Sequence, residues 1–166
     1  MKQLFLLGLL ILAMCCPVFA QDLPSQAEIT DLTRKADEKV IVFETALRAA
    51  KPFIPDENFK KFSNAADTAH VIIRNLQQKG PTAYSLVALV MTLDDLVIDA
   101  RLTIGYIFAN GLKLLSEGKG LQPGAAGAAT FLDDAATACY DMSELIGHTT
   151  LRFIDVEEKI IDKIAK

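Results

Sequence analysis

The two histidines, His70 and His148, are the side chains of this chain best suited to general-base chemistry near neutral pH. A hydrolase built around either of them would also need a nucleophile and a group that orients the imidazole ring. The two histidines fall in separate helical segments, and no nucleophile-elbow motif surrounds either of them. A partly buried histidine or a histidine at a helix end is the structural alternative. The sequence therefore predicts no enzymatic activity and no catalytic residue.

Acidic side chains are the second group that could do chemistry, because clustered carboxylate oxygens hold Mg²⁺, Ca²⁺ or a diphosphate group through a metal. Asp95 and Asp99 are spaced i,i+4 and share one helix face. The DDxxD arrangement of prenyl-transfer enzymes would need an acid where this chain has Ile98. The alternative is a solvated acidic face near Arg101. No EF-hand loop, HExxH, CxxC or phosphate-binding glycine loop is present, so we expect no metal and no cofactor. The acidic residues considered are Asp94, Asp95, Asp99, Asp133, Asp134 and Asp141.

The first twenty residues predict a secretory signal peptide that is cleaved before Gln21. Lys2 precedes an apolar stretch, residues 4–14, and small residues lead to Ala20. A signal anchor is the alternative, but the apolar run is about eleven residues and a membrane-spanning helix needs roughly 20. A lipoprotein site at Cys15 or Cys16 is a further alternative. We expect the protein to be secreted into the extracellular space, where the cell wall is one place it could associate.

Residues 21–166 are predicted to form a single domain that is large enough to bury its own core. Its net charge is negative, since removal of Lys2 takes the total from −4 to −5, which argues against nucleic acid as a partner and against an electrostatic membrane anchor. Cys139 is the only cysteine left, so no internal disulfide can form. A buried, unreactive thiol and intermolecular pairing are its two interpretations.

Helical periodicity predicts an all-α fold, an antiparallel bundle of four to five amphipathic helices. A capping box at Ser25 and Glu28 opens the first helix, which runs to about Ala50. The second helix restarts after Pro55 and stops at Gly80-Pro81. The apolar stripes of these two helices are Ile29, Leu32, Ala36, Val40, Phe43 and Leu47, then Phe59, Phe62, Ala66, Ala69, Ile73 and Leu76.

The later helices are less well delimited by the sequence. The third is predicted from about Thr82 to Ala109 or beyond, with a bend or an end at Asn110-Gly111 and further turns up to Glu117. From Leu86 to Leu93 it is apolar nearly all round, which is typical of a helix packed on several sides. Its three carboxylates and Arg101 exclude a membrane span. The fourth helix begins near Ala125, and Gly147 or His148 either separates it from a last segment or lies within one continuous helix.

Hydrophobic residues make up 51% of the chain, more than the leader alone explains. This content fits either a tightly packed core or a bundle whose apolar lining encloses a cavity or groove for a lipid. Small residues early in the fourth helix fill little volume opposite the third helix, which shifts the balance slightly toward a cavity, but they equally allow the helices to approach closely. The candidate ligand-binding residues, facing inward from the middle helices, are Phe62, Leu89, Leu93, Val97, Phe131 and Met142.

From about Ala69 onward, the order of segments resembles a known family. A break at Pro81 precedes a long leucine-rich helix, and a turn at residues 117–120 leads to a Gly/Ala-rich helix that ends at Thr149-Thr150. This order resembles the fungal hydrophobic surface-binding protein A family, which includes antigenic cell-wall mannoproteins. The resemblance implies a secreted helical bundle without enzymatic activity that adsorbs to hydrophobic surfaces or encloses a fatty acid.

Two functions are therefore predicted. The first is a secreted, non-enzymatic binding protein for a hydrophobic small molecule, such as a fatty acid or similar lipid, or for an apolar surface. The second is a secreted protein-interaction module, an effector, inhibitor or antigen, that uses an exposed helix face.

Overall fold

The computed structural model describes residues 23–164, which form four helices packed against each other, with no strand in that range. The elements are α3 (Gln26–Ala50), the short 3₁₀ helix η1 (Lys51–Phe53), α4 (Asp56–Lys79), α5 (Ala83–Ser116) and α6 (Ala125–Ile164). The predicted all-α bundle is therefore confirmed. The predicted leader, residues 1–20, lies outside the described residues.

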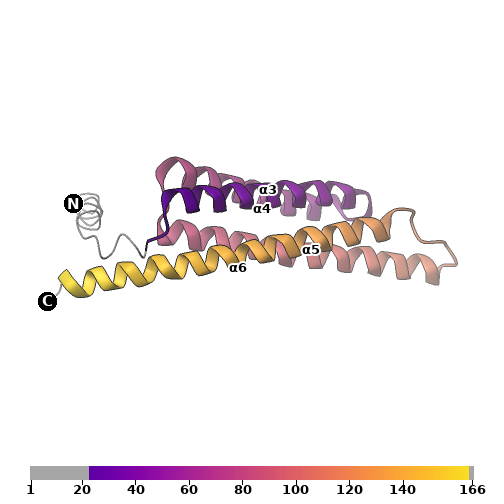
Figure 1. Ribbon diagram of the computed structural model, residues 1–166. Coiled ribbons are helices and arrows are strands. Elements are labelled where there is room, and N and C mark those ends of the chain that lie inside the picture. The colour runs from indigo at the N-terminus through magenta and orange to yellow at the C-terminus, as the bar shows by residue number, and fades with distance from the viewer. Residues whose placement is uncertain (1–22, 165–166) are drawn as a thin grey trace.

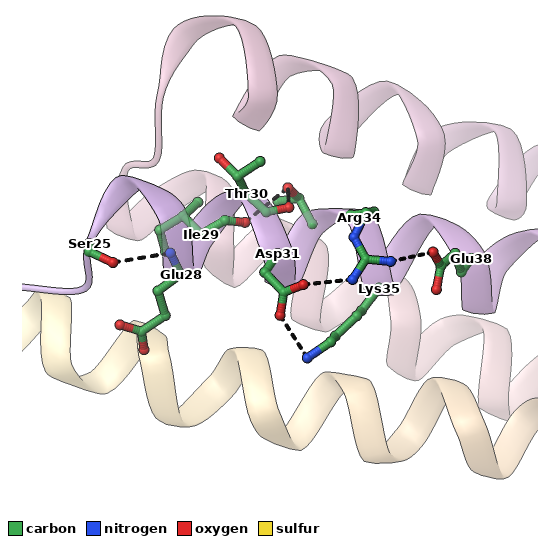
Figure 2. Close-up of polar contacts among 9 residues, drawn as sticks. Ser25, Glu28, Ile29, Thr30, Asp31, Arg34, Lys35 and Glu38 are labelled. Carbon is green, nitrogen blue, oxygen red and sulfur yellow. Dashed lines mark hydrogen bonds and ion pairs between the residues drawn. The ribbon is translucent and has the colours of Figure 1, made fainter.

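Polar side chains fix the start of α3. Ser25 caps the helix, because its hydroxyl oxygen accepts a hydrogen bond from the backbone N–H of Glu28 at 3.1 Å (Figure 2). The carboxylate of Glu28 binds Arg152 of α6 at 2.7 Å, so this residue ties two helices together. A ladder of ion pairs follows along the exposed face of α3, formed by Asp31, Arg34, Lys35 and Glu38.

Proline and glycine set the turns where the sequence predicts them. Pro55 precedes α4, and Gly80 ends it with a φ of 81°, a conformation that glycine adopts without strain. The next helix, α5, begins with a reciprocal capping box, in which Thr82 and Ser85 each bind the backbone N–H of the other, at 3.0 Å and 2.9 Å.

The four helices form a closed ring of contacts, in which α3 packs on α4, α4 on α5, α5 on α6 and α6 on α3. Short connections make neighbours along the chain antiparallel (Figure 1). Most of the core is one large cluster from all four helices, and the predicted stripe of the first helix is buried throughout, from Ile29 to Leu47. A second small cluster, Val156 and Ile160 with Leu23, covers the far end of α6.

The structure resolves two helix boundaries that the sequence leaves open. The third helix does not end at Asn110, because α5 continues to Ser116, and α6 runs through Gly147 and His148 as one helix of 40 residues. At 1.5 Å per residue, α5 is ~51 Å long and α4 only ~36 Å. The α5–α6 pair therefore projects beyond the turn that joins α3 to α4 (Figure 1).

The helix α5 packs on α4, α6 and η1, and one face of it remains open to solvent. On this open face, Met91 is 63% exposed and Val87 is 38% exposed. No helix within residues 23–164 is both long enough and apolar enough to cross a membrane.

Candidate ligand-binding site

Five of the six predicted ligand-binding residues lie together in the core of the bundle. Phe62, Leu89, Leu93, Val97 and Met142 belong to the one large cluster, and the least buried of them, Val97, is only 6% exposed. Phe131 is 37% exposed and lies outside that cluster. A ligand that touched the five core residues would displace packed side chains, which costs free energy. Their assignment as ligand-lining residues stays a prediction.

Exposed apolar side chains gather instead where the α5–α6 pair projects from the bundle. We call this region, residues 107–126, the hairpin tip. Phe108 is 60% exposed and Leu112 is 69% exposed, and Leu115 and Leu121 are exposed as well. Positions 108, 112 and 115 are spaced i, i+4, i+7, so they share one face of α5. Because α3 and α4 end short of the tip, neither helix covers this face.

The hairpin tip forms an apolar pocket of about 260 Å³. Its wall comes from three segments, the last turns of α5, the connecting loop and the start of α6, and Phe53 of η1 closes one side. Asn110 and Gln122 are the only lining residues with polar side chains, and no lining residue is charged. The apolar lining residues are Phe53, Ile107, Phe108, Leu112, Leu114, Leu115, Leu121, Ala125 and Ala126.

Backbone hydrogen bonds hold the loop of the tip in place. The N–H of Gly118 donates to the carbonyl of Leu115 at 3.0 Å, and the N–H of Lys119 donates to the carbonyl of Leu114 at 2.9 Å. With Gly118 at a φ of 72°, these bonds form a Schellman motif that ends α5. The chain then turns back, so that the loop returns across the last turns of α5.

Two glycines let the pocket wall close. A Cβ on Gly111 would lie 3.1 Å from Cδ2 of Leu121, so the missing side chain allows the loop leucine to rest on α5. Gly124 has a φ of 85°, and its carbonyl accepts the first backbone hydrogen bond of α6, from Ala128 at 2.9 Å. The ring of Phe53 lies 3.8 Å from the Cβ position of Gly124.

A wider hollow of about 470 Å³ adjoins the pocket at Phe53. It is lined by Pro52 and Phe53 of η1, by the following residues Ile54 and Pro55, and by Tyr106, Ala109, Asn110 and Lys113 of α5. Phe53 and Asn110 line both spaces.

A buried carboxylate lies in a third hollow, of about 280 Å³, between α4 and α5. Asp99 is 6% exposed, and its Oδ1 is 3.4 Å from Nζ of Lys61. Burial raises the pKa of Asp99, and the nearby ammonium of Lys61 partly opposes that shift. The expectation of a solvated acidic face is therefore wrong at Asp99, because α4 packs over this position. Asp95 on the same face is exposed.

The two histidines and Cys139 lie outside the three hollows described above. Nδ1 of His70 is 2.7 Å from Oδ1 of Asp37, and Nε2 is 3.6 Å from Glu44, so this half-buried ring links α4 to α3. His148 is exposed within α6. Cys139 is buried, and burial raises the pKa of its thiol to about 12, so the thiol is protonated at neutral pH. Within residues 23–164, no group of three His, Cys, Asp or Glu side chains could hold a metal ion.

The sequence contains one signal for the hairpin tip, the apolar side chains that follow Asn110-Gly111 at helical spacing. Helical spacing continues from Phe108 to Leu112, Leu114 and Leu115, and α5 does extend over these positions. Asn110-Gly111, in contrast, suggests an earlier end of the helix. Which helices project cannot be inferred from one helix alone, because it depends on all four lengths.

Comparisons with protein-family models, with curated proteins and with solved structures found no significant match for this chain. The resemblance to the fungal hydrophobic surface-binding protein A family stays a prediction.

Proposed function

We propose that this protein is an exported, non-enzymatic binding protein that takes an apolar chain, such as the acyl chain of a fatty acid, into the pocket at the hairpin tip. The observation that carries the proposal is the lining of this pocket, which is apolar except for Asn110 and Gln122. Solvent-exposed apolar surface of this kind is where soluble proteins bind apolar partners. Its export rests on the predicted leader.

The size of the pocket limits how much of a ligand it holds. Ligand pockets usually measure roughly 300–1,000 Å³, and this one, at about 260 Å³, lies just below that range. We therefore expect part of an acyl chain to be enclosed. The carboxylate of a fatty acid would stay in water at the mouth, because the lining offers no cation.

A weak affinity follows from the same geometry. Roughly ten buried methylenes gain about 8 kcal/mol, and association costs at least about 4 kcal/mol, which leaves a Kd near 1 mM. Further contact between the acyl chain and the exposed side chains of Phe108 and Leu112 lowers the Kd toward the micromolar range.

A variant that fills the pocket tests the proposal. Ala126 lines the pocket and is exposed in the first turn of α6, so Ala126→Phe occupies the space without entering the core. Ala27→Phe is the matched control, since Ala27 is exposed in the first turn of α3. The chain used is the expected mature form, residues 21–166, which contains the whole described bundle.

Binding is measured by native mass spectrometry and calorimetry with saturated fatty acids. We expect the original chain and Ala27→Phe to bind alike, and Ala126→Phe to bind at least about tenfold more weakly, because the phenyl ring replaces several methylenes. Equal binding by both variants, or no binding by the original chain, contradicts the proposal.

A further inference from the structure

The apolar rim of the hairpin tip faces outward as well as into the pocket. Phe108, Leu112, Leu115 and Leu121 are each at least half exposed, and they come from two turns of α5 and the neighbouring loop. The tip is also the end of the molecule at which the α5–α6 pair stands clear of α3 and α4 (Figure 1). A flat surface can therefore approach these four side chains without meeting the rest of the bundle.

The charge of this region is opposite to that of the whole chain. Within the hairpin tip, residues 107–126, Lys113 and Lys119 are basic and Glu117 alone is acidic, whereas the full chain has a net charge of −4. Lys119 pairs with Glu117 at 2.8 Å. Lys113 is exposed and makes no ion pair with any residue in the described part of the chain. The tip therefore presents a free cation beside its apolar side chains.

We infer that the hairpin tip docks on a lipid bilayer that carries anionic headgroups. Phe108, Leu112, Leu115 and Leu121 enter the boundary between headgroups and acyl chains, and Lys113 and Lys119 lie at the level of the phosphates. The inference goes beyond the proposed function, because docking places these four side chains, which also line the pocket, against a bilayer, whereas acyl-chain binding fills the space between them. The acidic remainder of the molecule, repelled by the same headgroups, favours contact through the tip alone.

Co-sedimentation with vesicles tests the inference. Vesicles of phosphatidylcholine mixed with phosphatidylserine should bind the chain, and vesicles of phosphatidylcholine alone should bind it at least about fivefold more weakly, the contribution expected from one surface lysine. Raising the salt concentration should reduce the difference, because salt screens exposed charges. Equal binding to the two kinds of vesicle would overturn the inference.

Two pairs of variants locate the contact. Leu112→Asp should lower vesicle binding at least about tenfold, whereas Met91→Asp, at a similarly exposed position on the same helix, should not change it. The double variant Lys113→Glu with Lys119→Glu should abolish the preference for phosphatidylserine. The control is Arg74→Glu with Lys79→Glu, which reverses the same number of charges at two exposed positions of α4, away from the tip. It should reduce the preference for phosphatidylserine less. If Met91→Asp abolishes binding and Leu112→Asp does not, the open face of α5 is the contact and the inference is wrong.

The variant Ala126→Phe distinguishes a failure of bilayer docking from a failure of acyl-chain binding. Ala126→Phe should lose fatty-acid binding from solution and retain vesicle binding, because it fills the pocket and leaves the outward leucines unchanged. A second copy of the chain is the competing occupant of the tip. If the original chain sediments as a dimer that Leu112→Asp converts to a monomer, and neither form binds vesicles, the inference is overturned.

Discussion

At the scale of single residues, Asp99 departs most from what its sequence neighbourhood suggests. Its carboxylate is buried between α4 and α5, and Lys61, whose own side chain is mostly exposed, is the cation closest to it. Ionisation is therefore less favourable in the folded chain than in water, as the raised pKa of Asp99 indicates. A carboxyl group of this kind costs stability when it is charged.

We predict that Asp99→Asn stabilises the fold at neutral pH, by a few tenths to about 1 kcal/mol. The folded chain holds the proton of Asp99 more tightly than the unfolded chain does, so its contribution to stability falls as pH rises from the ordinary pKa of 3.8 through the raised value. The free energies of unfolding of the two chains should converge below pH 3.8 and separate above it. Urea titrations at several pH values measure this, and a variant less stable at pH 7 would contradict the stated sign.

Residue-level predictions from sequence succeeded where the partner is local and failed where it comes from another helix. The Ser25 cap, the stop at Gly80 and the burial of Cys139 follow from spacing and residue type, and all three are confirmed. The burial of Asp99 and the contact of Leu121 with Gly111 depend on which segments meet in space. A single sequence does not contain that information in its local pattern.

At the scale of elements, the two longest helices pass through residues that usually end helices. Asn110 and Gly111 lie inside α5, and Gly147 and His148 lie inside α6. A glycine in a helix interior costs about 1 kcal/mol relative to alanine. Buried neighbours such as Ile107 and Ile146 offset this cost, because the helix must continue for them to pack.

Replacing glycines tests whether α6 is one helix. A Cβ on Gly147 meets no atom within 4 Å, so Gly147→Ala should stabilise the protein by about 1 kcal/mol and raise Tm by roughly 2–4 °C. Gly118→Ala should destabilise it by a similar amount, because Gly118 has a φ of 72° in the motif that ends α5. Thermal unfolding followed by circular dichroism gives both values. Destabilisation by Gly147→Ala would mean that this glycine breaks the helix.

At the scale of the whole molecule, the candidate site is a consequence of unequal helix lengths. A ring of four equal helices would cover the last turns of α5, and Phe108, Leu112 and Leu115 would then lie in a core. Because α4 is ten residues shorter than α5, these side chains and Leu121 remain at the surface around a pocket. The fold class and the turns were predictable from periodicity and from glycine and proline. The site was not, since it lies where the predicted third helix was expected to bend or end.

Five of the six predicted ligand-binding residues lie in the packed core and not at the hairpin tip, and their spacing explains why they were predicted. Inward-facing apolar positions of the middle helices, such as Leu89 and Leu93, are recognisable from helical spacing, and they form the packed centre. Spacing alone cannot distinguish a filled centre from a hollow one.

The central claim, that an apolar chain binds at the hairpin tip, is tested most directly by photolabelling. A fatty acid that carries a diazirine near the end of its acyl chain is irradiated with the chain comprising residues 21–166, and the labelled peptides are identified by mass spectrometry. We predict labelling within residues 107–126 and at Phe53, and its loss in Ala126→Phe. Labelling concentrated on Phe62, Leu89, Leu93 or Met142 would place the ligand within the bundle and contradict the claim.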